Sequence, residues 1–320
     1  MFRTLIFLGV LASWFAMATP SVKEVDLFDK SRERPVKVRI WYDNSRQCQN
    51  ANCLDSAPLM VFSHGAFGSP REYNWLAFAM AARGWNVIAP AHYGESWVYG
   101  RETVDPASVS RIDLRVQDLK FVLNNLDNIP NFANLSQAKK IVVAGHSSGG
   151  FTALSLAGAT FNHEKMASYC SDNVETDKSC QYDKKPKPTV SHADENDINK
   201  PELSEKVANG IIVFDPALGP GVNKASLTEI DIPILIFGSE NNDFLSFRTN
   251  AKYFADSLPY AELVTLANGE GHFVYLDACN HSHKAMGVSL CKDREGVNRE
   301  SAHQNMIKSV HQFINNISEH

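Results

Sequence analysis

Residues 141–159 carry the feature that most constrains this chain: an apolar run, a glycine-rich hexapeptide and a run of small residues follow one another directly. The apolar run 141–144 predicts a buried strand, and residues 149–159 predict a helix. The hexapeptide GHSSGG between them must turn the chain sharply, which forces a strained backbone at Ser147. Side chains at positions 145 and 149 would collide with the neighbouring strand and helix, so glycine is expected at both.

Ser147 occupies the tip of this predicted turn and is the candidate nucleophile. The N-terminus of the following helix favours negative charge, which suits a serine that gives up its proton during attack. Ser148 is the rival serine, but its side chain is expected to point away from the site. Its backbone N–H is expected to stabilise an oxyanion instead. The hexapeptide therefore predicts acyl-transfer chemistry at Ser147.

Apolar and amphipathic segments alternate along the rest of the chain, which predicts strands with helices between them. This alternation is typical of an α/β fold with a mainly parallel central sheet and helices on both faces. Two further strands near the N-terminus, joined by a polar turn, predict an antiparallel hairpin at one edge. The expected strands are residues 22–28, 36–42, 59–62, 86–89, 141–144, 211–214, 234–237 and 263–266, and the expected helices are 71–83, 108–126, 149–159, 247–258 and 302–317.

A polar segment at about residues 162–209 interrupts this alternation with many Lys, Asp, Asn and Pro residues. We interpret it as an insertion, either a cap over the site or a loop without a function of its own. The remainder of the 320-residue chain is short enough for one hydrophobic core. We therefore expect a single domain over residues 19–320 that carries this insertion.

The first residues are typical of a secretory signal. Arg3 supplies a positive charge, residues 5–16 form an apolar run, and Ala16-Met17-Ala18 is a small-x-small cleavage site. The apolar run is shorter than the ~20 residues that a membrane span requires. We therefore predict a signal peptide over residues 1–18 and an exported protein, periplasmic or extracellular, with no transmembrane segment.

Six cysteines follow this segment, and an even number in an exported chain predicts disulfide bonds. They form three pairs of close sequence neighbours, which favours local bridges, although sequence alone leaves the connectivity open. No CxxC motif or His/Cys cluster predicts a metal site. The expected pairs are Cys48–Cys53, Cys170–Cys180 and Cys279–Cys291.

The overall charge argues against one class of partner. The net charge is −5, and the sequence has no long basic run. Because nucleic-acid binding needs a clustered positive surface, no nucleic-acid partner is expected. The sequence leaves the oligomeric state open.

The loop after the expected strand 59–62 is the candidate source of a second oxyanion donor. It contains His64-Gly65, and a glycine there lets the backbone approach a substrate carbonyl closely. We expect the backbone N–H of Ala66 to be the donor, with Phe67 as the alternative. His64 is expected to shape this loop through local hydrogen bonds.

A site of this kind also needs an acid and a histidine, which follow the serine in that order along the chain. His272 fits the base because a loop containing glycines, just after the expected strand 263–266, can carry its imidazole back over the sheet. Asp215 and Asp243 each follow an expected strand that ends on the nucleophile's side. The acid would orient the imidazole and stabilise the imidazolium, and the residues alone leave the choice between the two open.

Aromatic residues gather near the predicted mouth of the site. They are candidates for an apolar pocket around the acyl or alcohol group of a substrate, although they could equally be packing residues. These residues are Phe67, Tyr93, Trp97 and Tyr99.

Five motifs occur in a fixed order: FSHG at 62–65, APAH at 89–92, GHSSGG at 145–150, FDPALG at 214–219 and GHF at 271–273. Together they resemble the predicted dienelactone-hydrolase branch of the α/β hydrolases. That branch is similar to platelet-activating-factor acetylhydrolases and, more distantly, to the lipase/chlorophyllase/cutinase group. The resemblance covers roughly residues 22–313, and the polar insertion departs from it.

The resemblance implies an acid and an activity. The acetylhydrolases carry their acid on the earlier strand, which favours Asp215 over Asp243. Dienelactone hydrolases use a cysteine nucleophile, so with Ser147 the name would describe ancestry and not substrate. The expected activity is cleavage of a small-molecule or lipid carboxylic ester through an acyl-enzyme, without a metal or an organic cofactor. The alternatives are a serine peptidase that uses the same serine, acid and histidine, and an inactive binding protein on this fold.

Overall fold

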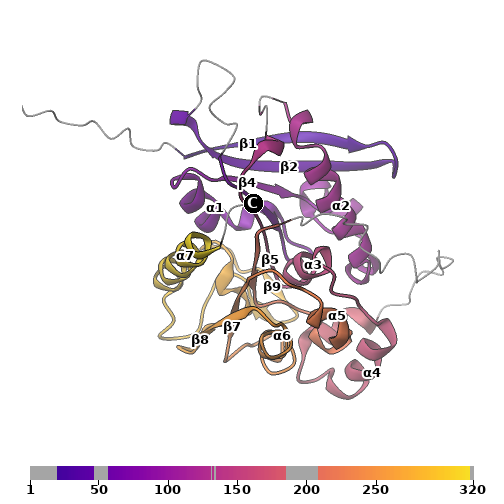
Figure 1. Ribbon diagram of the computed structural model, residues 1–320. Coiled ribbons are helices and arrows are strands. Elements are labelled where there is room, and N and C mark those ends of the chain that lie inside the picture. Colours follow the sequence, from indigo (N-terminus) through magenta and orange to yellow (C-terminus); the bar gives the residue numbers. More distant parts are fainter. Residues whose placement is uncertain (1–19, 47–56, 131, 133–134, 185–207, 318–320) are drawn as a thin grey trace, which may run out of the picture.

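The computed structural model describes residues 20–46, 57–130, 132, 135–184 and 208–317 of the chain (Figure 1). The expected signal peptide and the expected Cys48–Cys53 bridge lie outside these residues. Within the described part, no helix is long and apolar enough to span a membrane.

A central sheet of eight strands organises the domain, in the order β1-β2-β4-β3-β5-β6-β7-β8. β1, β2 and β4 pair antiparallel, and every other neighbouring pair is parallel. This confirms the expected fold class, with the hairpin at the edge of a mostly parallel sheet. The strands are β1 Pro20–Asp29, β2 Arg34–Asp43, β3 Leu59–Ser63, β4 Asn86–Pro90, β5 Ile141–His146, β6 Gly210–Phe214, β7 Ile234–Ser239 and β8 Ala261–Leu266.

Helices cover both faces of this sheet, and each face has its own apolar core (Figure 1). Helices α1 and α7 contribute Leu76, Met80, Val310 and other side chains to one core. Helices α2, α3 and α6 pack in the other core. The central strands have no exposed residue because both of their faces are covered. The helices are α1 Asn74–Ala81, α2 Ile112–Asn124, α3 Ser148–Leu156, α4 His163–Asn173, α5 Lys224–Thr228, α6 Ala251–Ser257 and α7 Arg299–Asn316.

Several short elements connect this framework. The 3₁₀ helix η8 lies in the first half of the polar insertion, just after α4. The short hairpin β9–β10 lies between the cysteines of the C-terminal pair. The short elements that matter below are η2 Pro70–Glu72, η3 Trp97–Tyr99, η5 Pro106–Ser110, η8 Lys178–Lys184, η10 His272–Tyr275, β9 Lys284–Ala285 and β10 Val288–Ser289.

The helix boundaries differ from the expected ones where side chains bind the backbone. The helix expected over 247–258 begins only at Ala251, because the Asn250 side chain holds the preceding turn. Its Oδ1 accepts from the Gly219 N–H at 3.0 Å, and its amide donates to the Ser246 carbonyl at 2.9 Å. Helix α4 was not expected, because its segment is polar and only Met166 and Cys170 of its residues are buried.

Both of the expected cysteine pairs that lie in the described residues are bonded. Cys170 at the end of α4 joins Cys180 in η8, and Cys279 joins Cys291 across the β9–β10 hairpin. Both bridges close short loops, with sequence separations of 10 and 12 residues.

Candidate active site

Ser147 sits in a strained turn between β5 and α3, with φ 57° and ψ −123°. The strained backbone is held from three sides. The Ser147 N–H donates to the Phe214 carbonyl at 3.0 Å, and its carbonyl accepts from the N–H groups of Phe151 at 3.2 Å and Ala217 at 3.1 Å. A left-handed backbone at a non-glycine residue costs free energy and persists only where surrounding contacts enforce it. The turn therefore presents the Ser147 hydroxyl in one fixed orientation.

The glycines of this turn are needed for close approach. A Cβ at Gly145 would collide with the Gly149 carbonyl in α3, and a Cβ at Gly149 would collide with the Ser63 carbonyl at the end of β3. These are the contacts with helix and strand that the sequence predicts. They bring β3, β5 and α3 together at one point below Ser147.

Three side chains that are far apart in the sequence are joined by hydrogen bonds here. Nε2 of His272 lies 3.0 Å from Ser147 Oγ, and Nδ1 of His272 lies 2.9 Å from Asp215 Oδ2. A carboxylate only accepts hydrogen bonds, so Nδ1–H donates to Asp215 and Nε2 is left to accept the Ser147 proton. All three residues are buried. The arrangement can therefore move a proton from the serine to the imidazole while the carboxylate holds the ring.

Asp215 is held by more than the histidine. It has φ 46°, and its N–H donates to the Phe237 carbonyl at 2.7 Å. The Ser239 N–H donates to Asp215 Oδ1 at 3.2 Å, and the Asn242 amide donates to Oδ2. Burial raises the pKa of the Asp215 carboxyl, and its hydrogen bond with His272 opposes that rise.

Asp243 approaches the same histidine from its backbone. The His272 N–H donates to Asp243 Oδ1 at 2.9 Å, and Arg294 lies 3.5 Å from the other carboxylate oxygen. The structure thus brings both candidate acids to His272, but only Asp215 contacts the imidazole. Asp243 fixes the start of η10, on which the imidazole is carried.

The candidate oxyanion loop is residues 64–68, between β3 and η2. A Cβ at Gly65 would lie 3.5 Å from Ser147 Cβ, so the loop backbone passes directly beside the nucleophile. Ala66 follows this point, and Phe67 has φ 56° in the tight turn that the Gly68 N–H closes on the Gly65 carbonyl at 3.2 Å. Ser148 is the first residue of α3, and the N–H groups of a first helical turn have no partner within the helix. Ala66 and Ser148 therefore remain the candidate donors, with Phe67 as the alternative.

A fully buried arginine lies under this loop. Arg115 of α2 donates through Nε to Thr152 Oγ1 at 3.0 Å and through Nη1 to Glu95 Oε2 at 2.6 Å. Its Nη2 donates to the His64 carbonyl and reaches Ser63 Oγ at 3.4 Å. Burial raises the pKa of Glu95, and the Arg115 charge opposes that rise. One guanidinium thus ties the loop to α3 and to the segment after β4.

The buried carboxylate of Asp118 continues this network, and His92 connects it to Ser63. His92 bridges Ser63 Oγ and Asp118 Oδ2, each at 2.9 Å, and its backbone N–H donates to His64 Nε2 at 3.0 Å. Burial disfavours the Asp118 charge, but hydrogen bonds from His92 and Arg34 outweigh it and hold the pKa of Asp118 at about 2. Burial and the nearby Arg115 charge lower the pKa of His92 to about 4. A neutral His92 therefore donates from Nδ1 to a carboxylate and accepts from Ser63.

The four candidate pocket residues lie in three places. The Tyr99 hydroxyl is bound by the Lys37 N–H at 2.7 Å, and the Tyr99 ring contacts Tyr93 at 5.1 Å, so both tyrosines pack beside β2. Trp97 donates to Glu72 Oε1 at 3.3 Å. Phe67 alone joins a series of rings that reaches His272, through Tyr182 and then Phe244.

Several residues of this site were not anticipated from the sequence. Arg115 had a usable signal, since it and Asp118 interrupt the apolar face that Ile112, Leu119 and Val122 form on this helix. Asn242 and Phe244 had none, because they lie in a loop whose path depends on the rest of the fold, and Tyr182 had none because it lies in a short 3₁₀ helix of a polar segment.

One group in the described residues has the spacing of metal ligands. Ligand atoms of Cys279, His281 and Cys291 lie within 4.8 Å of one another, so a His/Cys cluster exists that the sequence did not reveal. The disulfide uses both sulfur atoms, which removes the thiolates that would bind an ion.

Comparison with known proteins places this architecture. The model of the alpha/beta hydrolase family matches residues 60–281. Esterase 2 of the Planctomycetes species Thermogutta terrifontis, with butyrate bound, is 17% identical with a TM-score of 0.53, over 93% of this chain and 94% of that chain. The same esterase with propionate bound is 16% identical with a TM-score of 0.52, over 93% of this chain and 94% of that chain. The structure of this esterase phosphorylated by paraoxon has the same identity, TM-score and coverage as the propionate complex.

At such identities the similarity to solved structures shows the fold alone, and no curated protein matches the sequence. The family match is the stronger finding because it spans more than half of the chain and includes both Ser147 and His272. The chain belongs to the alpha/beta hydrolase family.

Proposed function

We propose that this protein is a serine esterase that cleaves carboxylic esters of small molecules or lipids through an acyl-enzyme on Ser147. One observation carries the proposal: hydrogen bonds of 2.9 and 3.0 Å run without a break from Asp215 through His272 to Ser147 Oγ. This is the arrangement in which a histidine takes the proton of a serine as the serine attacks a carbonyl.

The reaction uses each group in turn. Ser147 Oγ attacks the ester carbonyl while His272 Nε2 takes its proton, and Asp215 stabilises the imidazolium that forms. Backbone N–H groups of Ser148 and Ala66 would bind the oxyanion, where losing one donor typically costs ~10²–10³ in rate. His272 then gives its proton to the leaving alcohol, and water cleaves the acyl-enzyme by the same steps in reverse order.

The comparisons support an ester substrate. The structurally similar Thermogutta terrifontis protein is described as an esterase, and it is phosphorylated by paraoxon and phosphonylated by sarin. Both modifications suggest that phosphonate probes will report on the corresponding group of this chain.

A fluorophosphonate probe tests the proposal directly. We expect labelling of the folded protein at Ser147, no labelling of Ser147→Ala, and hydrolysis of p-nitrophenyl acetate by the wild type only. Ser148→Ala is the matched control, because it keeps the backbone N–H and should still be labelled. A folded wild-type protein that stays unlabelled would contradict the proposal. Peptide cleavage without hydrolysis of short esters would indicate a serine peptidase.

We also propose that the protein lies in the dienelactone-hydrolase-like branch and is exported. The order of its motifs supports the branch, and the bridges Cys170–Cys180 and Cys279–Cys291 suit an oxidising compartment. The mass of the protein recovered from the periplasm or medium should correspond to a chain that starts at Thr19. Recovery only from the cytoplasm, with residues 1–18 intact, would contradict export.

A further inference from the structure

Tyr182, in the polar insertion, connects the two sides of the candidate active site. Its ring lies 5.4 Å from the ring of Phe67 in the candidate oxyanion loop and 6.2 Å from the ring of Phe244 after β7. Phe244 in turn stacks on the His272 imidazole at 5.2 Å, with only 11° between the planes. A substrate group between the oxyanion loop and the base would therefore meet Tyr182.

The Tyr182 side chain is suited to form a wall rather than to take part in the chemistry. Burial raises the pKa of its hydroxyl to about 12, with a smaller contribution from the Glu95 charge. The hydroxyl therefore stays neutral at ordinary pH, and the ring presents an apolar surface. Tyr182 also lies in the apolar cluster of Ala217, Phe244 and Leu245.

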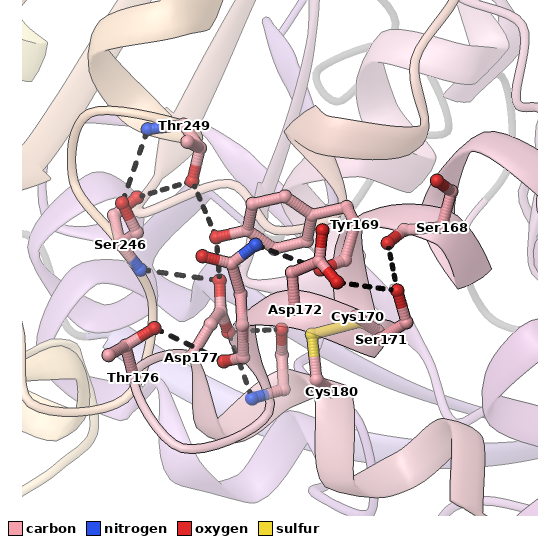
Figure 2. The surroundings of a disulfide bond; sticks show 12 residues. Ser168, Tyr169, Cys170, Ser171, Asp172, Thr176, Asp177, Cys180, Ser246 and Thr249 are labelled. Carbon is pink, nitrogen blue, oxygen red and sulfur yellow. Dashed lines mark hydrogen bonds between the residues drawn. A yellow bond between two sulfur atoms is a disulfide. The ribbon is translucent and has the colours of Figure 1, made fainter.

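The segment before Tyr182 is fastened at several points, as Figure 2 shows. Cys180, two residues earlier, is bonded to Cys170 in α4. The carboxylate of the fully buried Asp177 accepts from the Tyr169 hydroxyl at 3.2 Å and from the Ser246 N–H at 3.4 Å (Figure 2). These contacts tie η8 to α4 on one side and to the loop after β7 on the other.

A further hydrogen bond reaches the aromatic wall itself. The Lys178 N–H at the start of η8 donates to the Phe244 carbonyl at 2.9 Å. Phe244, whose ring stacks on His272, and Lys178, which begins η8, are thus held to each other through backbone atoms. The position of Tyr182 is fixed relative to the base, although it lies in a segment of low regularity.

We propose that Tyr182 is a specificity-determining residue that limits the size of the acyl or alcohol group at the active site, and that the Cys170–Cys180 bridge holds it in place. This rests on the esterase function proposed above. A wall of this kind acts through volume: a longer group must displace the ring, whereas a short one does not. Its removal should therefore favour long substrates over short ones.

The test compares two series of esters. p-Nitrophenyl esters from acetate to octanoate vary the acyl group, and acetate esters from methyl to octyl vary the alcohol. We expect Tyr182→Ala to raise the ratio of kcat/KM for the longest over the shortest member by about tenfold in one series, as for other changes of pocket size. Tyr182→Phe should keep the wild-type ratio. Tyr260→Ala is the matched control, because that exposed tyrosine lies just before β8.

The role of the bridge is tested in both backgrounds. Cys170→Ala/Cys180→Ala should raise the same ratio when Tyr182 is present and leave it unchanged in Tyr182→Ala, because both changes remove the same wall. If Tyr182→Ala leaves both ratios unchanged, the inference is wrong. If the bridge variant changes the ratio equally in both backgrounds, the bridge does not act through Tyr182. Fluorophosphonate labelling of every variant counts active sites, so a protein that is not labelled contradicts the esterase proposal instead.

Discussion

The two sides of Ser147 are held by different kinds of contact. Toward β3 and β4, the candidate oxyanion loop rests on a buried network of charges centred on Arg115 and Asp118. Toward β7, the Phe244 ring stacks on His272, and Tyr182, from a disulfide-clipped insertion, lies beside Phe244. Hydrogen bonds fix direction, whereas ring contacts mainly fill volume. The first side suits the placement of backbone donors, and the second suits a surface that can vary with the substrate.

The charged side is costly to build. A buried ion pair repays its loss of hydration only when nearly every donor and acceptor is satisfied. Arg115 meets this condition, since Nε, Nη1 and Nη2 all have partners. A similar apolar residue would pack there at less cost, but it could not hold the His64 carbonyl in a fixed direction.

The largest expected effect concerns Asp215, the carboxylate that contacts the His272 imidazole. Asp215→Asn should lower kcat for p-nitrophenyl acetate by ~10⁴, because an amide no longer stabilises the imidazolium or selects the productive tautomer. Asp243→Asn is the matched control and should lower kcat far less, since Asp243 contacts His272 only at its backbone N–H. Rates are compared at equal folded fraction. A larger loss in Asp243→Asn would reverse the assignment of the acid.

The next effect tests whether the charged network positions the oxyanion loop. Arg115→Met/Glu95→Gln removes the ion pair without leaving one partner charged and buried. We expect kcat to fall by about 10², as when an oxyanion donor is lost, with a much smaller change in KM. Steady-state kinetics below the unfolding transition measure both parameters.

A second ion pair, in which Arg299 is buried and Asp293 is partly exposed, provides the control for that variant. Arg299 binds Asp293 at 2.8 Å on the α7 side, away from the oxyanion loop. Arg299→Met/Asp293→Asn should lower Tm but keep kcat. If both double variants lower kcat equally, the network contributes only to folding.

The smallest expected effect is on the pH dependence of stability. The pKa of His92 is lowered to about 4 in the folded protein, against about 6.5 in an unfolded chain. Between these values the unfolded chain binds the extra proton, so stability is lost as pH falls from about 6.5 to 4. Chemical denaturation at several pH values across this range gives the free energy of unfolding. This free energy should fall less steeply with decreasing pH in His92→Asn than in the wild type. The exposed His311→Asn is the control, and an unchanged slope in His92→Asn would contradict the prediction.

The elements of the site differ in how well the sequence predicted them. The Ser147 turn was predictable because its strand, its glycines and its helix are contiguous, so the local geometry follows from about twenty residues. His272 was predictable from its place after the last strand and the order of the groups along the chain. Arg115 was missed although a cation on an apolar helix face is a visible anomaly.

Much of the helical framework was also predictable, because its periodicity reflects burial against the sheet. Helix α4 and η8 were not, since polar segments of this kind are ordered by a disulfide and by side-chain hydrogen bonds such as those of Asp177. Neither contact leaves a periodic pattern in the sequence.

By itself, the sequence determined the fold class, the turn that presents Ser147, and the histidine that serves it, because each depends on neighbouring residues or on the order of strands. Only the tertiary structure decided which aspartate meets the imidazole. Asp215 and Asp243 both follow strands that end beside His272, and a difference of a few ångströms separates a contact with the ring from one with the backbone. It also decided that Arg115 lies beneath the candidate oxyanion loop and that the Tyr182 ring lies beside Phe67 and Phe244, because such contacts join residues that are distant in the chain.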